Sequence, residues 1–259
     1  MRKPMLTAIV SALALGFAAS SSPAEFDQTH KPFDQVLHHY VKAARVDYQG
    51  LKASPEELNR YLDQVAAVGK SDFKQWNEKQ QLAFLINAYN AYTLRLIADH
   101  YPVKSIKDIG SILNGPWDQP VVKLFGQTIT LNTLEHGILR KDYAEPRIHF
   151  ALVCAAKGCP PLRNEAYVGA RLDEQLDDQA KNFLANSSKN RVEAQKHVVY
   201  LSPIFKWYGE DFGKDSRSVL KFVRQYFPER EAKELGQGEF KIKYTDYNWS
   251  LNDAASEEK

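Results

Sequence analysis

The chain has 259 residues, of which 34 are Lys or Arg, 32 are Asp or Glu, and 12% are aromatic. The charges are interspersed and form no basic stripe of the kind that nucleic-acid-binding proteins carry, so we expect no nucleic-acid partner. The aromatic content is typical of a protein with a well-packed core, and no segment after the N-terminus is apolar enough to cross a membrane.

The first 24 residues have the three-part order of a secretory signal peptide. Two basic residues precede an apolar run from Leu6 to Ala19, and small residues follow it. The run has about 14 residues, whereas a helix needs about 20 to span a bilayer, so we expect cleavage rather than a permanent anchor. Cleavage is expected after Ala24, with Ala19 as the alternative. The expected mature protein, residues 25–259, is then periplasmic or secreted and has no stable membrane span.

The N-terminal half is predicted to be helical. Apolar residues recur at helical spacing over residues 33–44, and a Ser-Pro-Glu-Glu start opens a second helix over about 54–68. A third helix, residues 78–100, is apolar on nearly every face and is therefore expected to be buried. Its polar exceptions include Asn87 and Asn90, which share a face, and their amides must find hydrogen-bond partners in the backbone or in a site.

The rest of the chain mixes strands with helices. Residues 106–120 are expected to be a loop, and a β-hairpin follows over 121–131. Residues 132–135 have the spacing of a capping box that opens a helix through Arg140, and the apolar run over 147–154 is typical of a buried strand. The remaining predicted elements are helices at 172–184, 202–208 and 219–227 and strands at 198–201 and 240–244. Helices before strands predict one α+β domain, with a mostly helical N-terminal half packed on a small, mainly antiparallel sheet.

His149, Cys154 and Cys159 are the first candidate catalytic residues. A catalytic cysteine needs a base or a cation beside its sulfur, and a histidine supplies one. Residues five apart on a strand point to opposite faces, so Cys154 diverges from His149, whereas Cys159 lies on a loop that can fold back. The alternative is structural: a loop closed by a disulfide, or two buried thiols, beside a core histidine.

Glu135 is the fourth candidate catalytic residue. It falls beside the apolar stripe of its predicted helix, where a carboxylate can orient a histidine or pair with Arg140 or Arg147. It is also the glutamate of the predicted capping box, so a purely structural role is the alternative. The candidate substrate-binding residues are Asn87, Asn90, His136, Arg140 and Arg147.

We expect neither a metal nor a cofactor. Two cysteines and two histidines could form a zinc set (Cys154, Cys159, His149 and His136). However, four residues between the cysteines fit the zinc spacings only loosely, and an exported protein risks oxidation of the thiols. The sequence has no phosphate-binding loop, no G-x-S-x-G motif and no H-E-x-x-H motif. His38 and His39 lie on an amphipathic helix and are interpreted as a solvent-exposed pair.

Five ordered motifs resemble those of one family, catalogued as domain of unknown function 547. The motifs are AFLINAYNA (83–91), LEHGILR (134–140), PRIHFAL (146–152), CAAKGCPPL (154–162) and SPIFKWY (202–208). The resemblance covers about residues 30–250. It implies an exported stand-alone domain in bacteria and partner binding in plants, but it implies no reaction. In that family some members carry serine at the position of Cys159, which favours Cys154 as a nucleophile and opposes the strand geometry.

Three functions fit these residues. The first is a thiol-dependent hydrolase or acyl-transfer enzyme, distantly like papain or transglutaminase in architecture. Its expected roles are nucleophile (Cys154 or Cys159), base (His149), orienting group (Glu135 or Asn87) and oxyanion donor (Asn90 or the backbone of the Gly158 loop). The second is a module that binds a small molecule or a peptide without cleaving it. The third is a thiol–disulfide redox protein, which ranks last because the two cysteines lack Cys-x-x-Cys spacing. The enzyme hypothesis ranks only narrowly first, because a free thiol in an oxidising compartment has to be protected or paired.

Overall fold

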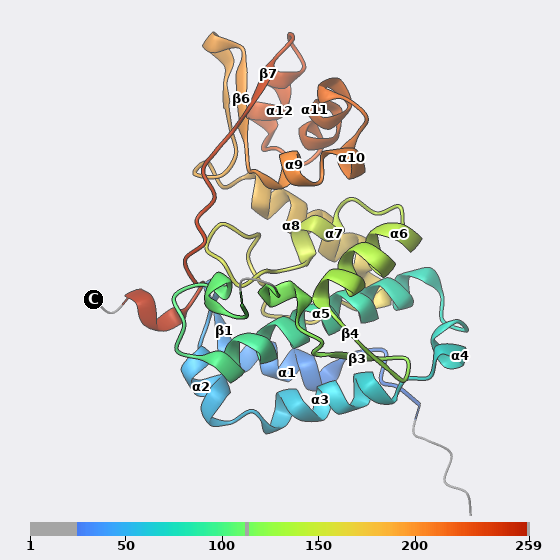
Figure 1. Ribbon diagram of the computed structural model, residues 1–259. Helices are drawn as coiled ribbons and strands as arrows, with labels where there is room; N and C mark the ends of the chain where they lie inside the picture. The colour runs from blue at the N-terminus through green and yellow to red at the C-terminus, as the bar shows by residue number, and fades with distance from the viewer. Residues whose placement is uncertain (1–24, 112–113, 258–259) are drawn as a thin grey trace, which may run out of the picture.

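A computed structural model describes residues 25–111 and 114–257 of the chain (Figure 1). The predicted signal peptide, residues 1–24, lies outside the described residues. Within the two described ranges, no helix is both long enough and apolar enough to cross a bilayer.

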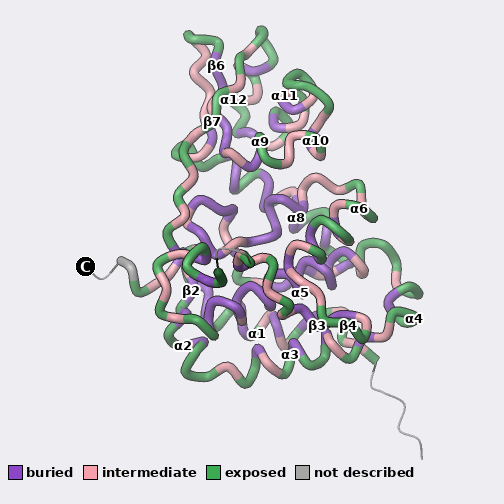
Figure 2. Tube along the Cα trace, in the orientation of Figure 1, coloured by how far each residue is buried: buried purple, intermediate pink, exposed green. Residues whose placement is uncertain are grey.

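The N-terminal part of the molecule is built around one long helix, α5 (Glu78–His100). The Asn77 side chain accepts a hydrogen bond from the Gln80 N–H at 3.0 Å and caps the first turn. From Leu82 to Ala98 every residue except Arg95 is buried, and Figure 2 shows this helix enclosed by the rest of the chain. The other helices of this part are α1 (Lys31–Tyr40), α2 (Tyr48–Ala53), α3 (Glu56–Ala67) and α4 (Lys70–Phe73). The three helices predicted in this half are confirmed, although α1 is shorter than expected.

The strands form three small sheets. Two are antiparallel pairs, β1 (Val41–Lys42) with β2 (Arg45–Val46) and β3 (Val122–Leu124) with β4 (Gln127–Ile129). In the third sheet, β6 (Val198–Leu201) lies between two strands. It is antiparallel to β5 (Arg191–Glu193) and parallel to β7 (Lys241–Tyr244). The predicted hairpin and the α+β fold class are confirmed.

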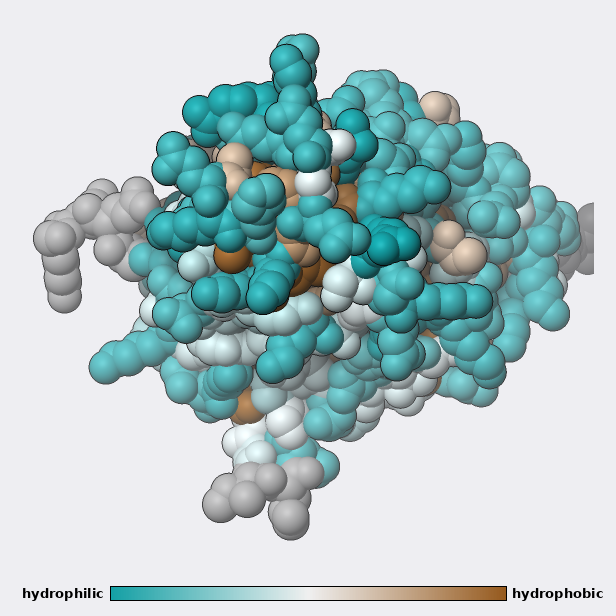
Figure 3. All heavy atoms as spheres, turned by 90° about the horizontal axis from the view of Figure 1, so that it is seen from above, coloured by the Kyte–Doolittle hydropathy of each residue, from teal (hydrophilic) through white to brown (hydrophobic). Residues whose placement is uncertain are grey.

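The C-terminal part has a hydrophobic core of its own. Figure 1 shows this part above the helices of the N-terminal part. The short helix α6 (Arg140–Asp142) precedes this part in the chain. The helices of the C-terminal part are α8 (Leu172–Leu184), α9 (Ile204–Trp207), α10 (Gly209–Phe212), α11 (Ser216–Arg224) and α12 (Glu229–Leu235). Seen from this end, the surface is mostly hydrophilic, with hydrophobic residues showing in the gaps (Figure 3).

After β7 the chain returns to the helices of the N-terminal part (Figure 1). The Leu251 N–H donates to the Lys104 carbonyl at 2.8 Å, which fastens the returning segment to the first part. Tyr247 lies on this segment and packs against both hydrophobic cores. The return therefore brings C-terminal side chains to the junction of the two parts.

The strand predicted over residues 147–154 is wrong. The chain there forms the short helix α7 (Ile148–Ala151) and then an extended segment without a strand partner. The side chain of Asn90 replaces that partner, because its amide donates to the Ala151 carbonyl at 2.9 Å and accepts from the Val153 N–H at 3.0 Å. An apolar run cannot by itself distinguish a buried strand from a buried helical segment.

The capping box predicted at residues 132–135 is also wrong. The Asn132 side chain makes no cap; it donates to the Asp118 carboxylate at 2.6 Å, and the Thr133 N–H bonds to the Thr130 hydroxyl instead. The segment Thr133–Leu139, η3, is a π-helix, a wider turn that is frequent at functional sites. Glu135 is thereby released from the capping role.

Candidate functional site

A cavity of about 220 Å³ lies where α5, η3, α7, the cysteine loop, α9 and the returning C-terminal segment meet. Its walls are largely aromatic, and the aromatic residues are Tyr89, Trp117, Trp207, Tyr208, Tyr247 and Trp249. Three ionisable side chains of the predicted site also line it: Glu135, His136 and His149. The two cysteines complete the wall.

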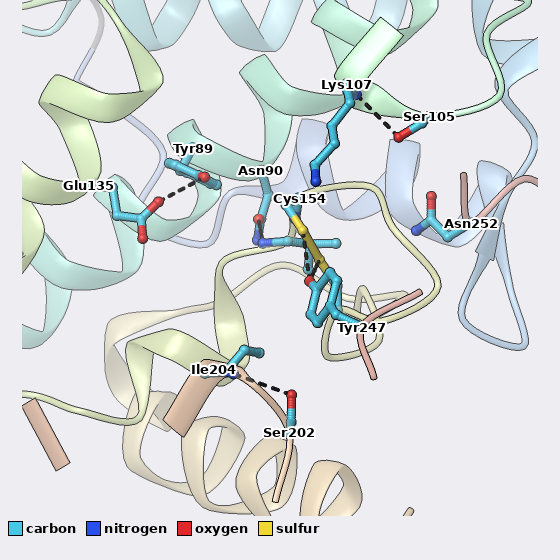
Figure 4. Close-up of a disulfide and its surroundings, with 12 residues drawn as sticks. Tyr89, Asn90, Ser105, Lys107, Glu135, Cys154, Ser202, Ile204, Tyr247 and Asn252 are labelled. Atoms are coloured by element: carbon cyan, nitrogen blue, oxygen red, sulfur yellow. Dashed lines mark hydrogen bonds between the residues drawn. A yellow bond between two sulfur atoms is a disulfide. The ribbon is translucent and has the colours of Figure 1, made fainter. Parts of the chain in front are cut away.

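Cys154 and Cys159 form a disulfide, with their Cα atoms 6.3 Å apart. The Tyr247 hydroxyl donates to Cys159 Sγ at 3.0 Å and lies 3.1 Å from Cys154 Sγ (Figure 4). Within the described ranges, no histidine forms a hydrogen bond with either sulfur. Of the alternatives open for the two cysteines, the disulfide-closed loop is the one present, and neither sulfur is a thiolate in this state.

His149 is fixed from two sides by residues of the C-terminal part. Its Nε2 lies 2.6 Å from Asp211 Oδ2, and its ring stacks on Tyr208 with the ring centroids 4.0 Å apart. Because residue 149 belongs to a helical turn rather than a strand, the expected divergence of His149 and Cys154 does not apply. Both residues line the same cavity.

Asp211 also receives a two-pronged hydrogen bond from Arg140. Arg140 Nε lies 2.6 Å from Oδ2 and Nη2 lies 2.9 Å from Oδ1, while Nη1 lies 2.8 Å from His136 Nδ1. Burial acts to raise the pKa of Asp211, but the hydrogen bonds and charges of His149 and Arg140 outweigh it and hold this pKa below its usual value. Asp211 therefore stays ionised and binds both the Arg140 guanidinium and the His149 imidazole.

Glu135 lies deeper and has a different set of neighbours. Only 5% of the residue is exposed, and the Tyr89 hydroxyl donates to its Oε2 at 2.9 Å (Figure 4). Burial raises the pKa of Tyr89, and the negative charge of Glu135 raises it further. The same two causes raise the pKa values of Tyr208 and Tyr247. Glu135 is thus a buried carboxylate among phenols that keep their protons.

Some of the predicted binding residues have structural roles. The Asn87 amide donates to the Tyr167 carbonyl at 2.7 Å and accepts from the Tyr167 N–H at 3.0 Å, and Asn90 holds the segment after α7. The expectation that buried amides find backbone partners is confirmed for both. Arg147 lies in an ion-pair network with Glu145, Asp173 and Asp177. Asn87, Asn90 and Arg147 do not line the cavity, whereas His136 does. Arg140 does not line the cavity either, but it bonds to Asp211, which in turn holds His149.

Asp211 and most of the aromatic wall were not predicted from the sequence. Asp211 lies on α10, a four-residue helix that no periodicity reveals, and it is 62 residues from His149. The Tyr247-Asn248-Trp249 sequence offered a weak signal, because it places two large aromatic side chains in a segment without helical or strand periodicity. Nothing local linked these residues to the cysteine loop.

The fold and the site together define an α+β protein with a disulfide-bounded, aromatic cavity at the junction of two hydrophobic cores. Residues 73–184 match the model of the family described as "Protein of unknown function, DUF547", which confirms the family predicted from the five motifs. No curated protein and no solved structure matches the chain, so the expected distant likeness to papain or transglutaminase has no support from these comparisons. The matched segment includes Glu135, His149 and both cysteines, whereas Asp211 and Tyr247 lie beyond it.

Proposed function

We propose that this protein binds a small organic molecule in the aromatic cavity. The observation that carries the proposal is the convergence of two buried polar side chains, Glu135 and His149, on a concave space walled by six aromatic residues. Concave apolar sites with a few fixed polar groups are the usual form of small-molecule sites. Both polar groups are held in place, Glu135 by Tyr89 and His149 by Asp211, which limits the entropy lost on binding.

Binding without cleavage is favoured over thiol catalysis by the state of the cysteines. The enzyme hypothesis needs a thiol within hydrogen-bonding reach of a histidine, whereas the two sulfurs are bonded to each other and accompanied by Tyr247. It also assigned roles to Asn87 and Asn90, whose amides are engaged with backbone groups.

A fragment screen by ligand-observed NMR tests the binding function. We expect fragments that bind the wild-type protein to lose at least about tenfold in affinity in Trp249→Ala, because an aromatic wall of the cavity is removed, equivalent to about 1.4 kcal/mol. Tyr244→Ala is the matched control, since Tyr244 is an exposed aromatic residue that does not line this cavity. Fragments that bind both variants equally, or no binding to the wild type, would contradict the proposal.

A thiol-dependent hydrolase or acyl-transfer enzyme is the second candidate. It is favoured by the contact between His149 and Asp211, because a carboxylate that orients a histidine base is a recurrent part of nucleophilic sites. It requires reduction of the disulfide, after which a cysteine thiolate would attack an acyl carbon and the leaving group would take up the proton from His149. Turnover of an activated thioester only under reducing conditions, lost in Cys154→Ser, would place this candidate first.

Thiol–disulfide exchange is tested by the same reduction. A reduction potential below about −300 mV would mark the Cys154–Cys159 bond as structural, whereas a markedly higher potential would favour a redox role. Alkylation of the reduced cysteines that leaves ligand binding intact would support the binding proposal over both thiol functions.

A further inference from the structure

The Glu135 carboxylate has no cation of its own. It is buried, and in the part of the chain that the structure describes it forms no ion pair. The Tyr89 hydroxyl donates to it, and its negative charge contributes to raising the pKa of the neighbouring Tyr208. The negative charge of Glu135 contributes to raising the pKa of Arg140. However, the Arg140 guanidinium bonds to Asp211 and His136 and not to Glu135. Buried charges are ordinarily paired, because an unpaired ion loses its hydration without compensation.

The tyrosines satisfy the carboxylate only in part. A carboxylate can accept about four hydrogen bonds, and each phenol hydroxyl donates one. The raised pKa values of Tyr89 and Tyr208 keep these hydroxyls protonated, so they stabilise the anion without neutralising it. One negative charge is left facing the cavity.

The aromatic walls already bind cations within the chain. The Lys107 ammonium lies 3.6 Å from the centroid of a Trp249 ring, and the Arg140 guanidinium lies 5.1 Å from the centroid of the Tyr208 ring. The faces of aromatic rings attract cations because their π electrons carry negative charge, and the attraction is larger where water is excluded. Walls of this kind around a buried carboxylate form an environment complementary to an organic cation.

We infer that the ligand of this cavity carries an amine or quaternary ammonium group, held by the Glu135 carboxylate and by the aromatic faces around it. The inference rests on the proposed binding function and narrows it to one chemical class. An organic cation would supply the charge that Glu135 lacks, and its alkyl groups would contact the rings of Trp249 and Tyr208.

A pair of isosteric probes tests the class of ligand. Choline and 3,3-dimethyl-1-butanol have nearly the same shape and differ in charge, and 3,3-dimethylbutyrate offers the same alkyl group with the opposite charge. We expect isothermal titration with wild-type protein to give at least about tenfold tighter binding for choline than for the alcohol, and weaker binding still for the acid. This comparison requires no variant.

Two charge-changing variants sharpen the test. Glu135→Gln keeps the shape of the side chain and is expected to abolish the preference for choline while leaving the weak binding of the alcohol in place. Glu210→Gln is the matched control, because Glu210 is exposed on α10 and its replacement changes the net charge by the same amount. Thermal unfolding of both variants checks that each is folded.

The outcomes separate this inference from the function on which it rests. Equal affinities for choline and the alcohol, or tighter binding of the acid, would overturn the cation while leaving the binding site intact. A preference for choline that persists in Glu135→Gln would overturn the role of the carboxylate. Failure of both the probes and the fragment screen would overturn the binding function itself.

Discussion

Asp211 and Glu135 are two carboxylates of one site with opposite surroundings. Asp211 is about a quarter exposed, yet it bonds to a guanidinium and an imidazole. Glu135 is almost completely buried, yet the group that donates to it is the neutral hydroxyl of Tyr89. A carboxylate whose interactions are complete contributes to the structure, whereas one that lacks a counter-ion remains available to a ligand. Under the proposed binding function, Asp211 would therefore support the site and Glu135 would take part in recognition.

Removal of the Asp211 charge should have the largest effect on stability. Asp211→Asn leaves Arg140 and His149 without their shared anion, and we expect the free energy of unfolding to fall by about 2 kcal/mol. This expected loss is smaller than the loss usually caused by removing one partner of a fully buried ion pair, because solvent screens the exposed part of Asp211. Chemical denaturation measures the loss, with Glu210→Gln as the exposed control. Equal stability of Asp211→Asn and Glu210→Gln would show that Asp211 does not support the site and would contradict its contrast with Glu135.

The contribution of Asp211 should also depend on pH. Its pKa in the folded protein lies below the usual value of 3.8, so the folded state binds fewer protons than the unfolded state in acid. The stabilisation is therefore fully present above about pH 4 and is lost as the pH falls through the lower, folded-state pKa. The difference in unfolding free energy between wild type and Asp211→Asn should accordingly shrink below about pH 4, and a difference that grows in acid would contradict this assignment.

Glu135→Gln should behave in the opposite way from Asp211→Asn. Replacement of a buried carboxylate without a cation by a neutral amide of the same shape removes an uncompensated charge and keeps an oxygen for the Tyr89 hydroxyl. We expect the free energy of unfolding to rise by about 1 kcal/mol. A loss as large as that of Asp211→Asn would show that Glu135 has a structural counter-charge, and the comparison would fail.

The smallest effect is expected for the hydroxyl beside the disulfide. Tyr247→Phe removes the donor to Cys159 Sγ and leaves the ring that packs against both cores, so the free energy of unfolding should fall by about 0.5–1 kcal/mol. Tyr244→Phe is the control, because Tyr244 is exposed. A change of several kcal/mol in denaturant titrations would mean that the hydroxyl, rather than the ring, joins the two parts.

The elements that local rules govern could be predicted from the sequence. The ends of α5, the hairpin β3–β4 and the helix α8 agree with their predictions, because a cap, a turn and an apolar period are all encoded within a few residues. The family and the presence of Glu135, His149 and the two cysteines in the site were also within reach, since the five motifs are local sequences.

Tertiary structure decided how these residues meet. The apolar run around His149 became a helical turn because Asn90, from α5, supplied the backbone partners that a neighbouring strand would have supplied. Glu135 left the expected capping box because Asn132 bonds to Asp118. The contact between His149 and Asp211 spans 62 residues and that between Cys159 and Tyr247 spans 88, and no local pattern encodes such distances. The sequence by itself determined most of the candidate residues and the long helix α5 at the centre of the N-terminal part; packing decided the local structure around His149 and Glu135, which charges are paired and which one faces the cavity.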